Sequence, residues 1–148
     1  MRHLALLALS AALAIPLSLA APAAGRAADW DIPPADVDCP DATSNVEMAT
    51  CADAAFKKAD AELNAVWKEV LATIKPDGGT ITDDIAAAWK ADLVAAQQAW
   101  VTFKDKDCNG ARSYEYWGGS GRGLAVTSCL YEYTAARVAD LKARYLDR

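Results

Sequence analysis

The sequence contains a single histidine, His3, which lies in an N-terminal segment that we expect to be removed during export. The mature chain would then contain no imidazole group. This absence excludes catalytic triads in which His acts as the base, and it excludes zinc and copper sites with His ligands.

Residues 1–28 have the pattern of a secretory signal peptide. A short basic start is followed by a run of Ala and Leu from residue 4 to residue 20, and small residues offer cleavage points between 20 and 28. The apolar run is too short for a stable membrane span, although a retained anchor is the alternative. No cysteine precedes Cys39, so a lipoprotein anchor is excluded. We expect a periplasmic or secreted protein without a membrane anchor.

The mature chain also lacks a cluster of Lys and Arg residues. Without the segment before Asp29, 13 basic residues face 20 acidic ones, a net charge near −7. Such a chain is a poor nucleic-acid binder. It should be attracted instead to basic protein partners, because complementary charge raises encounter rates.

The four cysteines do not include a close Cys-x-x-Cys pair, which disfavours a zinc site made of four thiolates. An even number in an exported chain indicates two disulfides. We favour Cys39–Cys51 and Cys108–Cys129, because each bond closes a short loop around a helix end. Cys51–Cys108 with Cys39–Cys129 is the rival pairing, since an antiparallel hairpin would place Cys51 and Cys108 at the same height.

The strongest structural pattern is a helix over residues 44–74. Ser44 and Glu47 form a capping box at its start, and an apolar stripe follows without Pro or Gly. Pro76 and Gly78 then end the helix. Residues 29–43, which contain three prolines, are expected to be an extended lead-in to the domain of residues 44–148.

Two further helices are predicted. The second begins near Thr82, carries an inner stripe from Ile85 to Phe103 and ends at residues 107–109, with Gly110 as the break. The third covers residues 124–146, with Tyr133 on its inner face. We therefore predict an all-α fold: a small disulfide-stapled bundle of three main helices, formed by an antiparallel hairpin and a third helix.

Residues 109–123 between the second and third helices have no regular period. They combine five glycines with aromatic and Arg residues, a composition favoured at binding surfaces. An equally weighted alternative is a loop whose aromatics cap the core. The candidate partner-binding residues are Arg112, Tyr114, Tyr116, Trp117 and Ser120.

No set of side chains converges on an active site. Asp105 and Asp107 are two residues apart on a helix, so they point in different directions and do not form a carboxylate pair. Asp60 lies beside the apolar stripe of the first helix, where it can contact Lys104 or Arg137 in a structural role. We predict no catalytic residue, no metal site and no cofactor.

Several of these residues resemble the LprI-type lysozyme-inhibitor-like domain. The resemblance runs from about residue 39 to residue 141. It is carried by Cys39, Glu47-Met48, Cys51, the run 59–64, the run 96–100, Phe103-Lys104-Asp105, Cys108, Cys129 and Arg137. It implies structural roles for Asp60, Leu63, Asn64, Gln97, Trp100, Lys104, Asp105 and Arg137.

The resemblance implies a small helical exported protein, with inhibition of lysozyme attributed to some members. The family usually shows Tyr-Arg where this chain has Phe103-Lys104, and Lys cannot repeat the two-pronged hydrogen bonding of Arg. Two hypotheses follow. The chain blocks a basic lysozyme with residues 109–123, or it is a non-inhibitory binding or structural module of the envelope.

Overall fold

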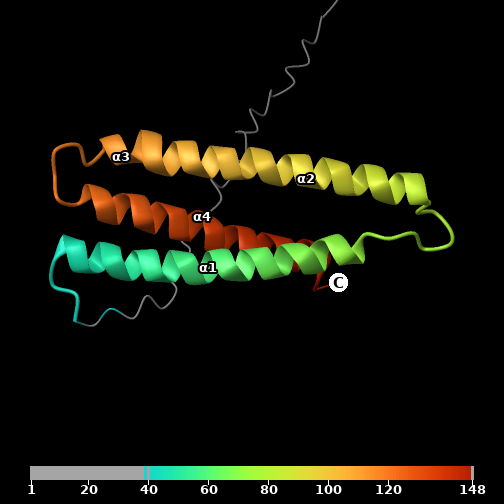
Figure 1. Ribbon diagram of the computed structural model, residues 1–148, viewed down its shortest axis with the longest axis horizontal. Helices are drawn as coiled ribbons and strands as arrows, with labels where there is room; N and C mark the ends of the chain where they lie inside the picture. The colour runs from blue at the N-terminus through green and yellow to red at the C-terminus, as the bar shows by residue number, and fades with distance from the viewer. Residues whose placement is uncertain (1–38, 40, 148) are drawn as a thin grey trace, which may run out of the picture. The chain divides into compact units, whose positions relative to one another are not determined.

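The computed structural model describes Cys39 and residues 41–147, and this part of the chain is helical without strands (Figure 1). Its elements are α1 (Asn45–Thr73), α2 (Asp83–Asp105), the π-helix η1 (Lys106–Ala111), α3 (Arg112–Tyr114) and α4 (Arg122–Tyr145). The predicted all-α bundle of three main helices is confirmed. The expected signal peptide and most of the lead-in lie outside the described residues.

The capping box at the start of α1 is present. The backbone N–H of Glu47 donates to Ser44 Oγ at 3.2 Å, and the backbone N–H of Ser44 donates to Glu47 Oε2 at 3.0 Å. Further hydrogen bonds come from Thr43, and together these donors lower the pKa of the Glu47 carboxyl. The helix ends at Thr73, and Gly78 adopts the left-handed conformation in the turn that follows, with φ of 76°.

The sequence pattern predicts that the second helix breaks at Gly110, but the structure shows no break there. After α2 the chain continues as η1, which contains Gly110, and then as α3 up to Tyr114. A π-turn keeps the backbone helical while it changes the direction of the following side chains. Cys108 is thereby fully buried and bonded to Cys129 of α4. The irregular segment is therefore residues 115–121.

The helix packed most closely on α1 is α4, which lies between α1 and α2 in Figure 1. Small residues allow this approach: Ala52 and Ala59 are buried, and Gly123 of α4 faces Ala49 of α1. The predicted inner stripe of α2 is wrong in part, since Ile85, Trp89 and Phe103 are exposed. α2 has few close contacts with α1 and α4, and its buried residues are Ala86, Leu93 and Lys104.

The favoured disulfide pairing is confirmed, with Cys39 bonded to Cys51 and Cys108 bonded to Cys129. All four cysteines are thus oxidised, which excludes the four-thiolate zinc alternative. Within the described residues, no helix combines the length and the apolar character needed to cross a membrane.

Candidate functional site: an aromatic loop at the stapled end of the bundle

Residues 115–121 connect α3 to α4 at the end of the bundle where α1 begins (Figure 1), and together with Tyr114, the last residue of α3, we call them the aromatic loop. Its three large side chains point outward: Tyr114 is 65% exposed, Tyr116 50% and Trp117 67%. The alternative in which these aromatics cap the core is not what the structure shows. The loop presents them to solvent.

The indole of Trp117 is held from both neighbouring helices. Tyr114 stacks on it with ring centroids 5.3 Å apart, and the guanidinium of Arg122 lies 5.1 Å from its centroid. Arg122 also donates to Ser113 Oγ at 3.3 Å, and the fully buried Ser113 donates to the carbonyl of Gly110. Gly118 permits the tight turn because its φ is +81°, a conformation that other residues rarely adopt.

The remainder of the aromatic loop is tied to the start of α1. Asn45 donates through Nδ2 to Ser120 Oγ at 3.0 Å, which leaves the Ser120 hydroxyl hydrogen free to donate elsewhere. The ring of Tyr116 lies against Gly121, where an added Cβ would stand 3.4 Å from the ring. The loop is therefore a fixed surface whose exposed rings are already positioned.

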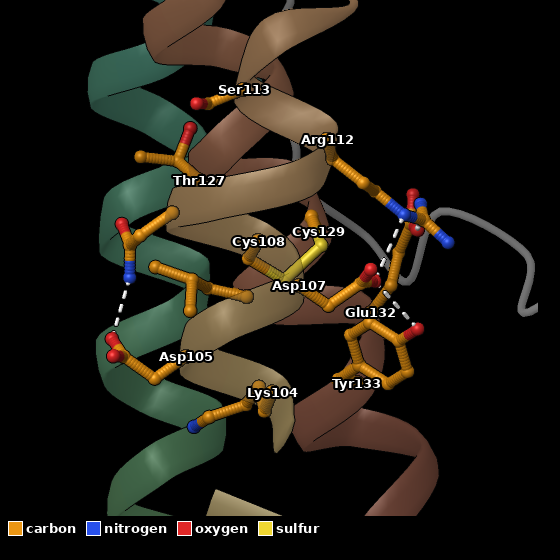
Figure 2. The surroundings of a disulfide bond; sticks show 12 residues. Lys104, Asp105, Asp107, Cys108, Arg112, Ser113, Thr127, Cys129, Glu132 and Tyr133 are labelled. Carbon is orange, nitrogen blue, oxygen red and sulfur yellow. Dashed lines mark hydrogen bonds and ion pairs between the residues drawn. A yellow bond between two sulfur atoms is a disulfide. The ribbon is translucent and has the colours of Figure 1, made fainter. Parts of the chain in front are cut away.

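Arg112 lies on the side of the bundle shown in Figure 2, together with Asp107, Glu132 and Tyr133. Its Nε is 3.3 Å from Asp107 Oδ2, its Nη1 is 3.7 Å from Glu132 Oε2, and its guanidinium lies 5.5 Å from the ring centroid of Tyr133. Tyr133 donates to the same Asp107 carboxylate at 2.9 Å. Burial, followed by this carboxylate, raises the pKa of the Tyr133 hydroxyl.

The structure brings three of the five candidate residues together. Arg112, Tyr116 and Ser120 line one groove of 540 Å³ between the aromatic loop, α4 and the first residue of α1. Tyr114 and Trp117 form the exposed stack described above and do not line this groove. Both Arg residues of the region have partners within the chain, Arg112 on Asp107 and Arg122 on Trp117.

Lys104 is buried between the helices, with only 7% of its surface exposed. Its Nζ donates to Thr134 Oγ1 at 3.1 Å and lies 5.1 Å and 5.0 Å from the ring centroids of Phe56 and Trp100. Burial lowers the pKa of Lys104, while the negative charges of Asp60 and Asp105 oppose that shift. This amine ties α1, α2 and α4 together.

A second tie involves Arg137 of α4. Its Nε donates to Gln97 Oε1 of α2 at 2.9 Å, its guanidinium lies 5.8 Å from the centroid of Trp100, and its Nη1 pairs with Asp140 at 2.8 Å. Arg137 thus links the second and third main helices. Leu63, another residue to which the resemblance assigns a structural role, belongs to the apolar core.

The expected contact of Asp60 with Lys104 or Arg137 is not a direct one. Among the residues that the structure describes, the Asp60 carboxylate accepts instead from Asn64 at 3.2 Å, and it acts on Lys104 only through its charge. Asp105 accepts from Asn109 at 2.7 Å, on the side of η1 away from Asp107. The two carboxylates point apart, as the sequence predicts.

Three residues of this region were not predicted as part of a site: Asn45, Glu115 and Glu132. Asn45 and Glu132 lie far from the aromatic loop in sequence and line the groove only because α1 and α4 begin beside it. The sequence pattern predicts that Tyr133 lies on the inner face of its helix, yet it is half-buried, while Tyr131 is buried in its place.

The geometry defines a small disulfide-bonded helical protein with a preformed aromatic surface. Residues 38–141 match the family model described as "Lysozyme inhibitor LprI", and the chain belongs to this family. It is also 38% identical over 108 residues to an uncharacterized protein of Rhizobium meliloti (strain 1021), covering 71% of this chain and 76% of the relative. No solved structure matches. The family and the two disulfides fit an oxidising compartment outside the cytoplasm.

Proposed function

We propose that this protein binds a basic lysozyme and blocks it with the aromatic loop. The observation that carries the proposal is the exposed stack of Tyr114 and Trp117, which is positioned by Arg122 before any partner arrives. Exposed Tyr and Trp rings are the side chains that most often dominate binding energy. A loop that is already ordered loses little conformational entropy on binding.

The charge of the chain supports the choice of partner. With residues 1–28 removed by a signal peptidase in the periplasm or during secretion, the net charge is near −7. Lysozymes of the basic class would be drawn to it over long distances, and that attraction weakens as salt is added. Ser120 supports contact inside the active-site cleft of the lysozyme, because its hydroxyl, which accepts from Asn45, can donate to a lysozyme carboxylate.

The family departure at Phe103-Lys104 does not count against this proposal. Lys104 is buried among Phe56, Trp100 and Thr134, so it serves the helix packing. Phe103 is exposed on α2 and packs edge-on against Tyr133, with ring centroids 5.6 Å apart. Neither residue is part of the aromatic loop.

The test is residual activity of a basic c-type lysozyme on cell walls, titrated with the oxidised mature protein at low and physiological salt. We expect stoichiometric inhibition that weakens with salt, and we expect Trp117→Ala to abolish it. Trp89→Ala is the matched control, because it removes an indole from the opposite end of the bundle. Circular dichroism verifies the fold of each variant.

The absence of inhibition by correctly folded wild-type protein would contradict the proposal for that lysozyme. The envelope-binding module would then be the better description of the protein. Loss of inhibition in both Trp variants would show that general destabilisation is responsible, not the loss of a contact.

A further inference from the structure

The groove beside the aromatic loop has an apolar floor and an acidic rim. Leu124 and Ala125 of α4 are half-buried at its base, and the carboxylates of Glu115 and Glu132 line it. The volume of 540 Å³ is sufficient for one long side chain. Neither the stack of Trp117 nor the buried Lys104 shares this space.

The negative charge of the groove is only partly compensated. The carboxylate of the exposed Glu115 makes no hydrogen bond or ion pair among residues 39 and 41–147. Glu132 Oε2 lies 3.7 Å from Nη1 of Arg112, which is beyond hydrogen-bond distance. Arg112 lies closer to Asp107 and over the ring of Tyr133, so its charge is shared among these groups.

An aromatic ring completes the groove. Tyr116 is half exposed, and its ring lies against Gly121, where an added Cβ would stand 3.4 Å from the ring. A cation above the face of such a ring is attracted by the ring quadrupole. An aromatic face, two carboxylates and an apolar floor together match a long cationic side chain, whose methylene stem packs on apolar surface while its head remains among charges.

We infer that this groove receives a lysine or arginine side chain from the bound lysozyme. The inference rests on the proposed function and adds a second contact to it, on the flank of the aromatic loop. The partner is chosen by charge complementarity, since the proposed target is a basic protein and the groove is acidic. In this arrangement the aromatic stack supplies most of the contact area, and the groove sets the orientation of the bound lysozyme by charge.

The experiment compares two double variants that remove the same charge. Glu115→Gln with Glu132→Gln alters the groove, whereas Glu69→Gln with Asp92→Asn removes two exposed carboxylates from the opposite half of the bundle. Association and dissociation rates with the basic c-type lysozyme are measured by surface plasmon resonance at low and physiological salt.

We expect the groove variant to raise the dissociation rate about tenfold, because a desolvated charge contact is lost. The control should change the dissociation rate by less than about twofold and lower mainly the association rate, as remote charges do. Equal dissociation rates for the two variants would overturn the inference. If wild type binds and Trp117→Ala does not, while the groove variant binds like wild type, the groove alone is refuted. If wild type does not bind, the proposed function fails as well.

Discussion

The two ends of the bundle are stabilised by different means. At the end near Gly78, an apolar core is formed by Leu63, Val66, Val70, Ile74, Ala86, Leu93, Val138 and Leu141, with Trp67, Trp100 and Tyr145 packed against it. At the opposite end lie both disulfides, the buried hydroxyl of Ser113 and the aromatic loop. The second end is therefore held by covalent bonds and hydrogen bonds in place of a large core.

This difference explains how the aromatic loop can remain exposed. A chain that depended on its aromatics for a core could not present them to a partner, because burial of such rings is worth several kcal/mol. The Cys108–Cys129 bond joins η1 to α4 directly below the loop, which removes that dependence. Lys104 and its ring neighbours mark the boundary between the two ends.

The largest effect is expected from Leu141→Ala, which tests the apolar end. Leu141 is fully buried within the core, so its truncation should lower the free energy of unfolding by about 2–5 kcal/mol. Urea unfolding followed by circular dichroism measures this change. Inhibition by the fraction that remains folded should be unaltered. A loss below about 1 kcal/mol would show that the apolar core contributes little to the stability of this end.

The next effect tests the stapled end. Replacing Cys108 and Cys129 together by Ala should cost roughly 2–4 kcal/mol, because the bond closes a sequence separation of 21 residues. Hydrogen exchange should accelerate first in residues 112–121. The matched control replaces Cys39 and Cys51, whose separation of 12 residues predicts a somewhat smaller cost. If replacing Cys108 and Cys129 accelerated hydrogen exchange equally throughout α1, the two ends of the bundle would not be stabilised independently.

A smaller effect is expected at the boundary, from Lys104→Met. The change removes a buried charge that has no carboxylate partner within ion-pair distance in the described chain, so it should stabilise the protein by about 1 kcal/mol at pH 7. Thr134 keeps its hydrogen bond to the carbonyl of Leu130. Lys90→Met, at an exposed site on the same helix, is the control and should change stability by less than about 0.5 kcal/mol.

The gain in the free energy of unfolding from Lys104→Met should become smaller as pH rises. Burial lowers the pKa of Lys104 in the folded state below its ordinary value of 10.5. Between the lowered value and 10.5 the unfolded chain binds more protons, so wild-type stability increases with pH across that window relative to the variant. Urea unfolding of both proteins at pH 7 and pH 10 measures the difference. A constant difference would show that the amine titrates alike in both states.

The smallest effect on stability is expected from Trp117→Ala, although its effect on inhibition should be the largest. The ring is mostly exposed, so the free energy of unfolding should fall by no more than about 0.5 kcal/mol. Trp67→Ala on α1 provides the contrast, because that ring packs on the core and should cost about 3 kcal/mol. Similar losses for both would place Trp117 among the structural residues.

Much of the fold is readable from local pattern. Ser44 and Glu47 identify the start of α1 because the capping box depends on two residues three positions apart, and both of its hydrogen bonds are present. The pairing of Cys39 with Cys51 also follows from short separation along the chain. The grouping of the exposed aromatics in one loop is likewise a local property of residues 114–117.

The errors arise where tertiary contacts override local preference. Gly110 normally disfavours a helix, but the Cys108–Cys129 bond and the hydrogen bond from Ser113 to the carbonyl of Gly110 fit a continuous helical backbone. The stripe of α2 predicts burial of Ile85 and Phe103, yet α4 occupies the position next to α1. Periodicity identifies an apolar face but not the helix that covers it.

Sequence patterns alone predict the helical class, the boundaries of α1, the oxidised cysteines and the family, because each depends on residues close together in the chain or on matched motifs. The burial of Lys104 cannot be read from these patterns, and neither can the groove that Glu115 and Glu132 share with Tyr116. These relations join residues from different elements, so they depend on how the helices pack and not on any local sequence pattern.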